Sequence, residues 1–415
     1  MGNNIPQGYK ATALGIIPQE WEVMRLGDIV SITSGESPSL YHLKAEGKYP
    51  YVKVEDLNNC EKYQESSREY SDDNNTTIKA GSIIFPKRGA SILNNKVRIA
   101  AKDIQMDSNM MAITPHTTIV DTEFLYIRIL HERLYRIADT SSIPQINNKH
   151  IIPYKIAVPP LAEQRKIAEV LGVWDEAIEK QARLIEKLDL RKRGLMQRLL
   201  SAKLRLPGFS EPWKKVKLGD IGDTYNGLSG KNKDDFEYGN AQFIPYINVF
   251  SNERIDTNNL GCVQIEPNEQ QNTVKYGDIF FTVSSETPDE VGMASVLLEH
   301  LDNTYLNSFC FGYRLNDFST LNPFFAAYLF RTEHFRNYMS VLAQGSTRFN
   351  ISKKEVMKLK IDLPTIEEQT AIAEVLTAAD REIELAKEKL ERLRRQKRGL
   401  MQQLLSGKKR VKINI

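Results

Sequence analysis

A long internal repeat constrains this chain more than any other feature of its sequence. The stretch Pro159–Leu171 reappears as Pro364–Leu376, at an offset of 205 residues (364 − 159). The same offset holds without a gap as far as Lys192–Gln197, which recurs as Lys397–Gln402. About half of the aligned positions are identical, which excludes chance. The chain therefore contains two copies of one long element.

Each copy of the repeat carries a heptad pattern, which on a helix requires a partner helix of the same kind. Because the chain supplies two such helices, we expect them to pair with each other as a coiled coil. In the first copy the predicted seam consists of Ile167, Leu171, Trp174, Ile178, Ile185, Leu188, Leu195 and Leu199. In the second copy it consists of Ile372, Leu376, Ile383, Leu390, Leu393, Leu400 and Leu404.

Prolines mark the start of both predicted helices. Pro160 precedes Leu161, and Pro364 lies just before Ile366; proline is tolerated in the first turn of a helix and not in its interior. A continuous helix from Gln164 to Leu200 would be roughly 55 Å long at 1.5 Å per residue. A coiled coil that serves only to dimerise the protein is the simpler interpretation. It does not explain why both copies of the helix lie in one chain with a full domain between them.

The segments ahead of the two helices repeat as well. Leu26-Gly27-Asp28-Ile29 matches Leu218-Gly219-Asp220-Ile221, and later landmarks keep their order while their spacing drifts. Short runs rich in Val, Ile and Tyr, separated by Gly, Pro, Asn and Asp, predict strands between Ile29 and Phe85. Helical patterns follow at about 123–138 and 323–342. Each segment should therefore fold as an α+β domain.

The predicted fold class is α+β, with two globular domains separated by two long helices. We place the domains at 1–158 and 204–363, and the helices at 159–203 and 364–415. We expect the helices to pair antiparallel, which relates the domains by a pseudo-two-fold axis. That arrangement suits duplex DNA, because the local two-fold axes of its backbone let two similar domains enter its grooves in equivalent orientations.

Bulk composition narrows the class of protein. The net charge is only +3, from 56 Lys plus Arg and 53 Asp plus Glu, so any nucleic-acid surface has to be local. The three cysteines, Cys60, Cys262 and Cys310, are far apart and odd in number, which favours a reducing cytoplasm over a disulfide framework. No window approaches 18 consecutive apolar residues, so we expect no membrane insertion.

Catalytic motifs are not evident in the sequence. Asn322-Pro323-Phe324-Phe325 is superficially similar to the Asn-Pro-Pro-Phe motif of adenine methyltransferases, but Asn322 as a helix N-cap and Pro323 in the first turn explain it structurally. The histidines are dispersed without metal-ligand spacing, and no Gly-Lys-Ser/Thr phosphate loop is present. We expect neither a metal site nor catalysis in this chain.

The duplicated pattern resembles the specificity subunits of type I restriction-modification systems. The resemblance rests on Pro-Pro-Leu-x-Glu-Gln, followed by a heptad helix that ends in Gly-Leu-Met-Gln-x-Leu-Leu-Ser. This block is present twice, each time behind a Leu-Gly-Asp-Ile domain, and the resemblance runs from about Pro18 to Arg410. One departure is Thr365, which stands where the first copy has Pro160.

The resemblance implies a non-catalytic subunit that reads two dissimilar half-sites in double-stranded DNA. Its domains would be target-recognition domains, and its helices a ruler that fixes the distance between the half-sites. It also implies docking of methyltransferase subunits and of the restriction subunit, with S-adenosylmethionine, ATP and Mg on those partners and no cofactor on this chain. A structural coiled-coil scaffold whose domains bind protein is the alternative, and it predicts no sequence-selective DNA affinity.

Two loops are candidates for DNA contact, because Arg reads guanine, Asn reads adenine and Lys suits phosphate. In the first domain the loop behind the strand that ends at Phe85 offers Lys87, Arg88, Ser91, Asn94, Asn95 and Lys96. The less basic equivalent in the second domain offers Ser284, Ser285 and Thr287, with further charge from Lys231 and Lys233. An ordinary solvated loop is the alternative. The connectors at 141–147 and 346–351, the second with Arg348, either face phosphate or simply orient the domain.

Two pairs of residues stand out within the predicted helices. Lys192 and Lys397 occupy seam positions, and symmetric pairing of the helices would bring Lys397 close enough to Trp174 for a cation–π contact. Gly194 and Gly399 interrupt the helices at a cost of about 1 kcal/mol relative to alanine. Close approach of another chain is one reason for these glycines, and fraying near the helix end is the other.

Overall fold

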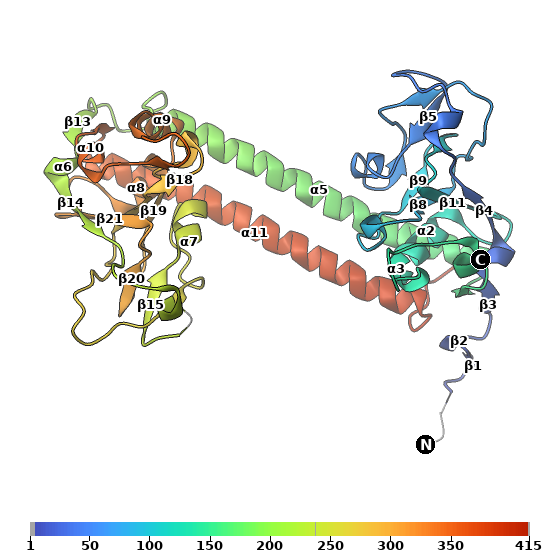
Figure 1. Ribbon diagram of the computed structural model, residues 1–415. Helices are drawn as coiled ribbons and strands as arrows, with labels where there is room; N and C mark the ends of the chain where they lie inside the picture. The colour runs from blue at the N-terminus through green and yellow to red at the C-terminus, as the bar shows by residue number, and fades with distance from the viewer. Residues whose placement is uncertain (1–4, 237, 414–415) are drawn as a thin grey trace. The chain divides into compact units, whose positions relative to one another are not determined.

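The computed structural model describes residues 5–236 and 238–413 and divides into two compact units (Figure 1). Unit 1 comprises residues 1–182 and 389–415, and unit 2 comprises residues 183–388. Each unit therefore contains one of the predicted domains together with a stretch of both long helices. This division differs from the borders drawn from the sequence, because each helix segment packs against the domain of its own unit.

The two long helices are α5 (Leu161–Leu199) and α11 (Ile366–Leu405). Both begin directly behind the turns in which the sequence places proline, as predicted. None of the predicted seam residues is exposed. The heptad pattern therefore identified the buried stripe of each helix correctly.

Within each unit the two helix segments pack antiparallel. In unit 1, Lys397 forms an ion pair with Asp175, while Leu404 shares a core cluster with Ile167. Later residues of α11 therefore lie beside earlier residues of α5, which is the antiparallel arrangement. Unit 2 has the same register, since Lys192 pairs with Asp380. The predicted antiparallel pairing is confirmed in each unit.

Unit 1 is built on a five-stranded sheet in the order β4-β11-β8-β9-β6. Its strands are β4 (Val30–Ser34), β11 (Met110–Pro115), β8 (Ile83–Pro86), β9 (Arg98–Ala100) and β6 (Tyr63–Gln64). A second sheet has the order β10-β5-β7 and contains β10 (Gln105–Met106), β5 (Tyr49–Val52) and β7 (Tyr70–Ser71). Two antiparallel pairs complete the strands: β1 (Tyr9–Thr12) with β2 (Gly15–Pro18), and β3 (Glu22–Arg25) with β12 (Lys155–Val158).

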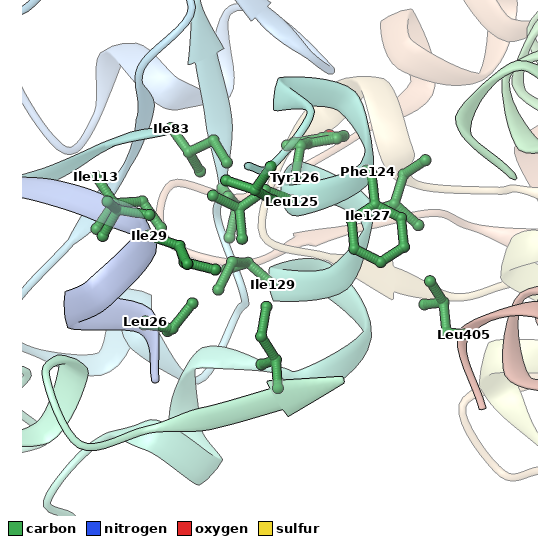
Figure 2. Packing of buried hydrophobic residues seen from close by; sticks show 14 of the residues in the cluster. Leu26, Ile29, Ile83, Ile113, Phe124, Leu125, Tyr126, Ile127, Ile129 and Leu405 are labelled. Carbon is green, nitrogen blue, oxygen red and sulfur yellow. The ribbon is translucent and has the colours of Figure 1, made fainter. Parts of the chain in front are cut away.

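The helices of the unit 1 domain are α1 (Leu26–Ile29), α2 (Thr122–Glu132), α3 (Leu134–Ile137) and α4 (Asn148–Ile151). Helix α2 packs its apolar face onto the sheet, and Leu405 joins the same cluster from the end of α11 (Figure 2). The single helix predicted at about 123–138 is interrupted. Arg133 separates α2 from α3 with a φ of 64°, which ends the right-handed helix.

Unit 2 repeats this plan with a four-stranded sheet in the order β14-β21-β17-β19. Its strands are β14 (Gly222–Asn226), β21 (Cys310–Leu315), β17 (Ile279–Thr282) and β19 (Ala294–Val296). The second sheet has the order β16-β15-β20 and contains β16 (Gly261–Val263), β15 (Ala241–Ile244) and β20 (Thr304–Leu306). The antiparallel pairs are β13 (Lys214–Lys217) with β23 (Lys360–Leu363), and β18 (Ser284–Ser285) with β22 (Phe349–Asn350).

The helices of the unit 2 domain are α6 (Leu218–Ile221), α7 (Tyr246–Ser251), α8 (Pro323–Leu329), α9 (Glu333–Leu342) and α10 (Lys353–Val356). Asn322 caps α8 by accepting from the N–H groups of Phe324 and Phe325, with Pro323 in the first turn. This confirms the structural explanation of the Asn-Pro-Phe-Phe sequence. The helix predicted at about 323–342 is again two helices, divided before Thr332, which caps α9.

Across the described residues, no helix is both long enough and apolar enough to cross a membrane.

Candidate nucleic-acid interface

The candidate loop of the first domain leaves the central sheet of unit 1 at Pro86. Strand β8 is buried along its whole length, and behind it Lys87 is half-buried and Arg88 is exposed. Gly89 has a φ of 88°, a conformation that L side chains rarely adopt, and it precedes the short 3-10 helix Ala90–Ile92. The basic pair therefore stands at the end of a core strand, on backbone of defined conformation.

The connector between this domain and α5 lies beside the loop. The Ile146 N–H donates to the Lys87 carbonyl at 2.8 Å, and the Gly89 N–H donates to a carbonyl of the connector at 2.9 Å. Arg88 and Gln145 also face each other across a β-bridge. The two segments, residues 86–96 and 141–147, thus form one surface, which we call the loop–connector surface of unit 1.

Unit 2 builds the same surface from equivalent positions, residues 282–287 and 346–351. The Ile351 N–H donates to the Val283 carbonyl at 3.0 Å. Ser284 faces Asn350 where β18 pairs with β22, as Arg88 faces its bridge partner in unit 1. Ser284 therefore occupies the position of Arg88, and the backbone geometry supports the equivalence of the two loops that the sequence predicted.

Neither Lys87 nor Arg88 forms an ion pair with a carboxylate among the described residues. Burial and the neighbouring Arg88 guanidinium lower the pKa of Lys87, and the Asp107 carboxylate offsets only part of this effect. Two adjacent cations without a counter-ion are stabilised by any anion that approaches them. A DNA phosphate is such an anion.

The remaining predicted residues of this loop divide into accessible and structural side chains. Asn94 is exposed, whereas Ser91 and Lys96 are half-buried. The Asn95 side chain donates to a carbonyl of α2 at 3.0 Å and accepts from an N–H of α3 at 2.9 Å. Because both ends of its amide are engaged, Asn95 ties the loop to the domain and is not available to read a base.

Of the two lysines predicted to supply charge in unit 2, only one is accessible. Lys231 forms an ion pair with Glu269 at 2.5 Å, and its side chain is only 3% exposed. Contrary to the prediction, it offers no free charge to DNA in this conformation. Lys233 is exposed in the 3-10 helix Lys233–Phe236.

The polar residues of the unit 2 loop are held by an acidic neighbour. Ser285 is buried and donates to Glu290 at 3.2 Å, and Thr287 donates to the same oxygen at 3.0 Å. Both hydroxyls are therefore committed to the loop itself. Arg348, on the connector, is exposed and has no ion-pair partner among the described residues.

The Glu-Gln step of the repeated motif fastens each domain to its helix. The Gln164 side chain is fully buried; it accepts from the Asp121 N–H at 2.8 Å and donates to the carbonyls of Ile119 and Pro159 at 2.9 and 2.7 Å. Gln369 makes the same three bonds in unit 2, at 2.9, 2.9 and 3.0 Å. The motif thus holds the domain at a fixed position on the first turn of the helix.

The preceding glutamate of each motif is buried and forms an ion pair that was not predicted from the sequence. Glu163 is paired by Arg410 at 2.6 Å and also accepts from the Trp21 indole at 3.0 Å. In unit 2, Glu368 is paired by Arg205 at 2.6 Å. The signal was present, because Arg205 and Arg410 lie at the same 205-residue offset (410 − 205) as the motifs themselves.

The two seam lysines are paired with aspartates, and the predicted cation–π contact is wrong. Lys397 forms an ion pair with Asp175, the residue next to Trp174, and no contact between Lys397 and the Trp174 ring is found among the described residues. In unit 2, Lys192 bridges Asp380 at 2.7 Å and Glu253 at 2.9 Å. Asp175 and Asp380 are equivalent in the repeat, so the helix pair carries the same ion pair in both units.

A groove lies in each unit beside the second part of the repeat. In unit 2 a cavity of about 1100 Å³ is lined by residues of α5, α8 and α9. In unit 1 a cavity of about 720 Å³ is lined by residues of α11 and of the α2–α3 junction. The grooves share equivalent helix residues: Arg193, Met196 and Gln197 in unit 2, and Arg398, Met401 and Gln402 in unit 1. We refer to them as the helix grooves. Gly194 also lines the larger groove.

Among residues 5–236 and 238–413, no group of three or more His, Cys, Asp or Glu side chains is placed to hold a metal ion.

Comparison with known proteins assigns both halves of the chain to one family. A family model described as type I restriction modification DNA specificity domain matches residues 18–189 and again 210–395. The type I restriction enzyme MjaVIII specificity subunit of Methanocaldococcus jannaschii is 26% identical, over 95% of this chain and 94% of the relative. The putative MjaX specificity subunit of the same organism is 25% identical, over 98% of this chain and 97% of the relative.

Solved structures share the fold. The S subunit of a type I restriction-modification system from M. genitalium has a TM-score of 0.53 at 17% identity, covering 97% of each chain. The HsdS subunit from Thermoanaerobacter tengcongensis has a TM-score of 0.52 at 19% identity, covering 94% of this chain and 98% of the other. A chain from a structural study of type I system assembly reaches 0.64 at 20% identity, covering 94% and 99%.

Proposed function

The chain belongs to the type I restriction-modification specificity subunits, with one DNA specificity domain matched in each half, and from this premise we propose that it reads a bipartite, asymmetric target in double-stranded DNA. One observation carries the proposal. Each unit builds a loop–connector surface on the same backbone plan, yet the side chains differ, with Arg88 in unit 1 and Ser284 in unit 2. Equivalent surfaces with different side chains are what two dissimilar half-sites require.

In this proposal the paired helices set the length of the unspecified gap between the half-sites. Support comes from the continuity of α5 and α11 and from the Lys–Asp pair that recurs in the same register in each unit. Half-sites read from one face of B-DNA are centred near one helical turn apart, roughly 34 Å. The Gln164 and Gln369 bonds transmit this spacing, because they fix each domain on the first turn of its helix.

The helix grooves are the proposed docking sites for two methyltransferase subunits. A groove lined by the same helix residues in both units suits two copies of one partner.

The chain itself is a non-catalytic subunit that functions in the cytoplasm. S-adenosylmethionine would be bound by the methyltransferase subunits, and ATP and Mg would be bound by the restriction subunit.

Sequencing of methylated DNA tests the proposal. Cells that express this chain with its methyltransferase subunit are compared with cells that express the methyltransferase alone. We expect a new methylated motif with two dissimilar halves and unspecified bases between them. A stable complex that leaves methylation unchanged would contradict the proposal and favour the scaffold interpretation.

A further inference from the structure

A tight turn before β11 presents one exposed side chain beside the unit 1 loop. The Asp107 carboxylate accepts from the Asn109 N–H at 2.8 Å, and the Asp107 carbonyl accepts from the Met110 N–H at 2.8 Å. The turn is also anchored to β5, because the Asp107 N–H donates to the Val52 carbonyl at 3.0 Å. Asn109 is exposed at its tip. Its amide donates one hydrogen bond to the same Asp107 oxygen at 2.8 Å, so only one end of this amide is engaged, unlike that of Asn95.

Unit 2 has the same turn before β21, with a different residue at the tip. The Asn307 side chain accepts from the Phe309 N–H at 2.9 Å, and the Asn307 carbonyl accepts from the Cys310 N–H at 3.0 Å. The Asn307 N–H donates to Ile244 of β15 at 3.1 Å. Phe309 therefore takes the place of Asn109.

Each turn is bonded directly to the loop–connector surface of its unit. The Lys87 N–H donates to the Asn109 carbonyl at 2.8 Å, and the Val283 N–H donates to the Phe309 carbonyl at 2.8 Å. Three equivalent positions thus lie together in each unit. In unit 1 they hold Lys87, Arg88 and Asn109, and in unit 2 they hold Val283, Ser284 and Phe309.

The exposure of Phe309 is not explained by packing. Phe309 is 58% exposed, whereas Phe311, two residues further along the chain, is fully buried. A second exposed apolar residue, Ile247, is 56% exposed and lies in α7, whose first residue, Tyr246, donates to the Ser284 carbonyl at 3.0 Å. Phe309 and Ile247 are thus exposed apolar residues on two segments that are hydrogen-bonded to the same loop, where their side chains are accessible to a ligand.

We propose that Asn109 and Phe309 are equivalent base-reading positions, and that Phe309 reads its half-site by apolar contact with a thymine methyl group in the major groove. This inference rests on the proposed function. Duplex DNA is the occupant because the equivalent surface of unit 1 carries the unpaired Lys87–Arg88 pair, and because exposed Arg348 supplies a cation for phosphate in unit 2. Asparagine reads adenine by hydrogen bonds, whereas phenylalanine suits the thymine methyl.

Deoxyuridine substitution tests this contact, because it removes only the thymine methyl. The complex of the full chain with its methyltransferase subunit is titrated with a duplex that carries the motif found by methylation sequencing. Each thymine of the two half-sites is replaced in turn by deoxyuridine. We expect one replacement to weaken binding about fourfold, the value of burying one methyl group. In Phe309→Ala the same replacement should have no effect.

Phe318→Ala is the matched control, since Phe318 is 42% exposed and lies beyond the opposite end of β21. This variant should bind like the original chain and keep its response to deoxyuridine. Asn109→Ala should relax selectivity in the other half-site only. If no replacement weakens binding in a Phe309-dependent manner, the inference is wrong although the motif stands. If no methylated motif exists for the original chain, the proposed function itself has failed.

Discussion

A single buried glutamine fixes each domain on its helix. Gln164 satisfies three backbone groups that the first turn of α5 and the neighbouring loop would otherwise leave without partners. Each buried group left unsatisfied costs about 1–3 kcal/mol. We therefore expect Gln164→Ala to lower the free energy of unfolding of unit 1 by roughly 3 kcal/mol, as measured by denaturant titration followed by tryptophan fluorescence.

Gln403→Ala is the control for this prediction, because Gln403 is exposed on α11. The control should change the free energy of unfolding by no more than about 0.5 kcal/mol. Equal stability of Gln164→Ala and Gln403→Ala would show that the motif does not hold the domain.

The unpaired charge of Lys87 should appear in the salt dependence of DNA binding. If Lys87 neutralises one phosphate, Lys87→Gln reduces the slope of log K against log salt by about 0.9, while Lys102→Gln, at an exposed lysine, leaves the slope unchanged. The lowered pKa of Lys87 adds a pH effect. Its contribution is complete below this pKa and is lost as the pH rises through it, so the difference between Lys87→Gln and the original chain should shrink in alkaline solution. An unchanged salt slope in Lys87→Gln would exclude a phosphate contact.

The sequence alone led to the two loops proposed to contact DNA, but not to the state of each side chain in them. The loop behind β8 was predicted from its Lys, Arg, Ser and Asn content. That Asn95 is structural, and that Lys231 is paired with Glu269, depends on neighbours distant in the sequence. The proposed base-reading positions Asn109 and Phe309 were not among the predicted residues, because nothing in their local sequence shows that they flank these loops.

At the scale of elements, the sequence predicted the helices best. A heptad repeated over the full length of α5 and α11 specifies a buried stripe, and duplication made the pattern certain. The breaks at Arg133 and before Thr332 were missed, because a helix boundary inside an apolar stretch is set by packing against the sheet rather than by local periodicity.

Alanine substitution at Gly194 tests the proposed docking groove, because it adds one methyl group to the lining of that groove. Nothing lies within 4 Å of a Cβ built at Gly194 or at Gly172, so alanine at either position should stabilise the isolated chain by about 0.5–1 kcal/mol. Only Gly194 lines a helix groove. We expect Gly194→Ala, but not Gly172→Ala, to weaken methyltransferase binding in calorimetry. Equal affinity of the two variants would argue against docking at this groove.

The role of the helices as a ruler can be tested by paired insertion. Seven residues inserted after residue 182 in α5 and after residue 388 in α11 preserve the heptad seam and add about 10 Å. The methylated motif should keep both halves and gain up to about three base pairs in the gap, at 3.4 Å per pair. Insertion in α5 alone should destabilise the chain, because it shifts one seam against the other. An unchanged gap after paired insertion would contradict the ruler.

At the scale of the whole molecule, the chain is one plan used twice. The Gln–backbone bonds, the Glu–Arg pair and the Lys–Asp pair recur in both units, while the loop–connector surfaces diverge. Retained contacts within the scaffold and divergent surfaces are consistent with two domains that perform the same task on different half-sites.

Replacement of residues 214–363 by a second copy of residues 22–158 tests this central claim most directly. Cells that express this variant with the methyltransferase subunit are examined by sequencing of methylated DNA. Our account predicts a symmetric motif made of two inverted copies of the half-site read by unit 1. Retention of the original second half, in cells where the complex forms, would show that the exchanged domain does not read it and would contradict the account.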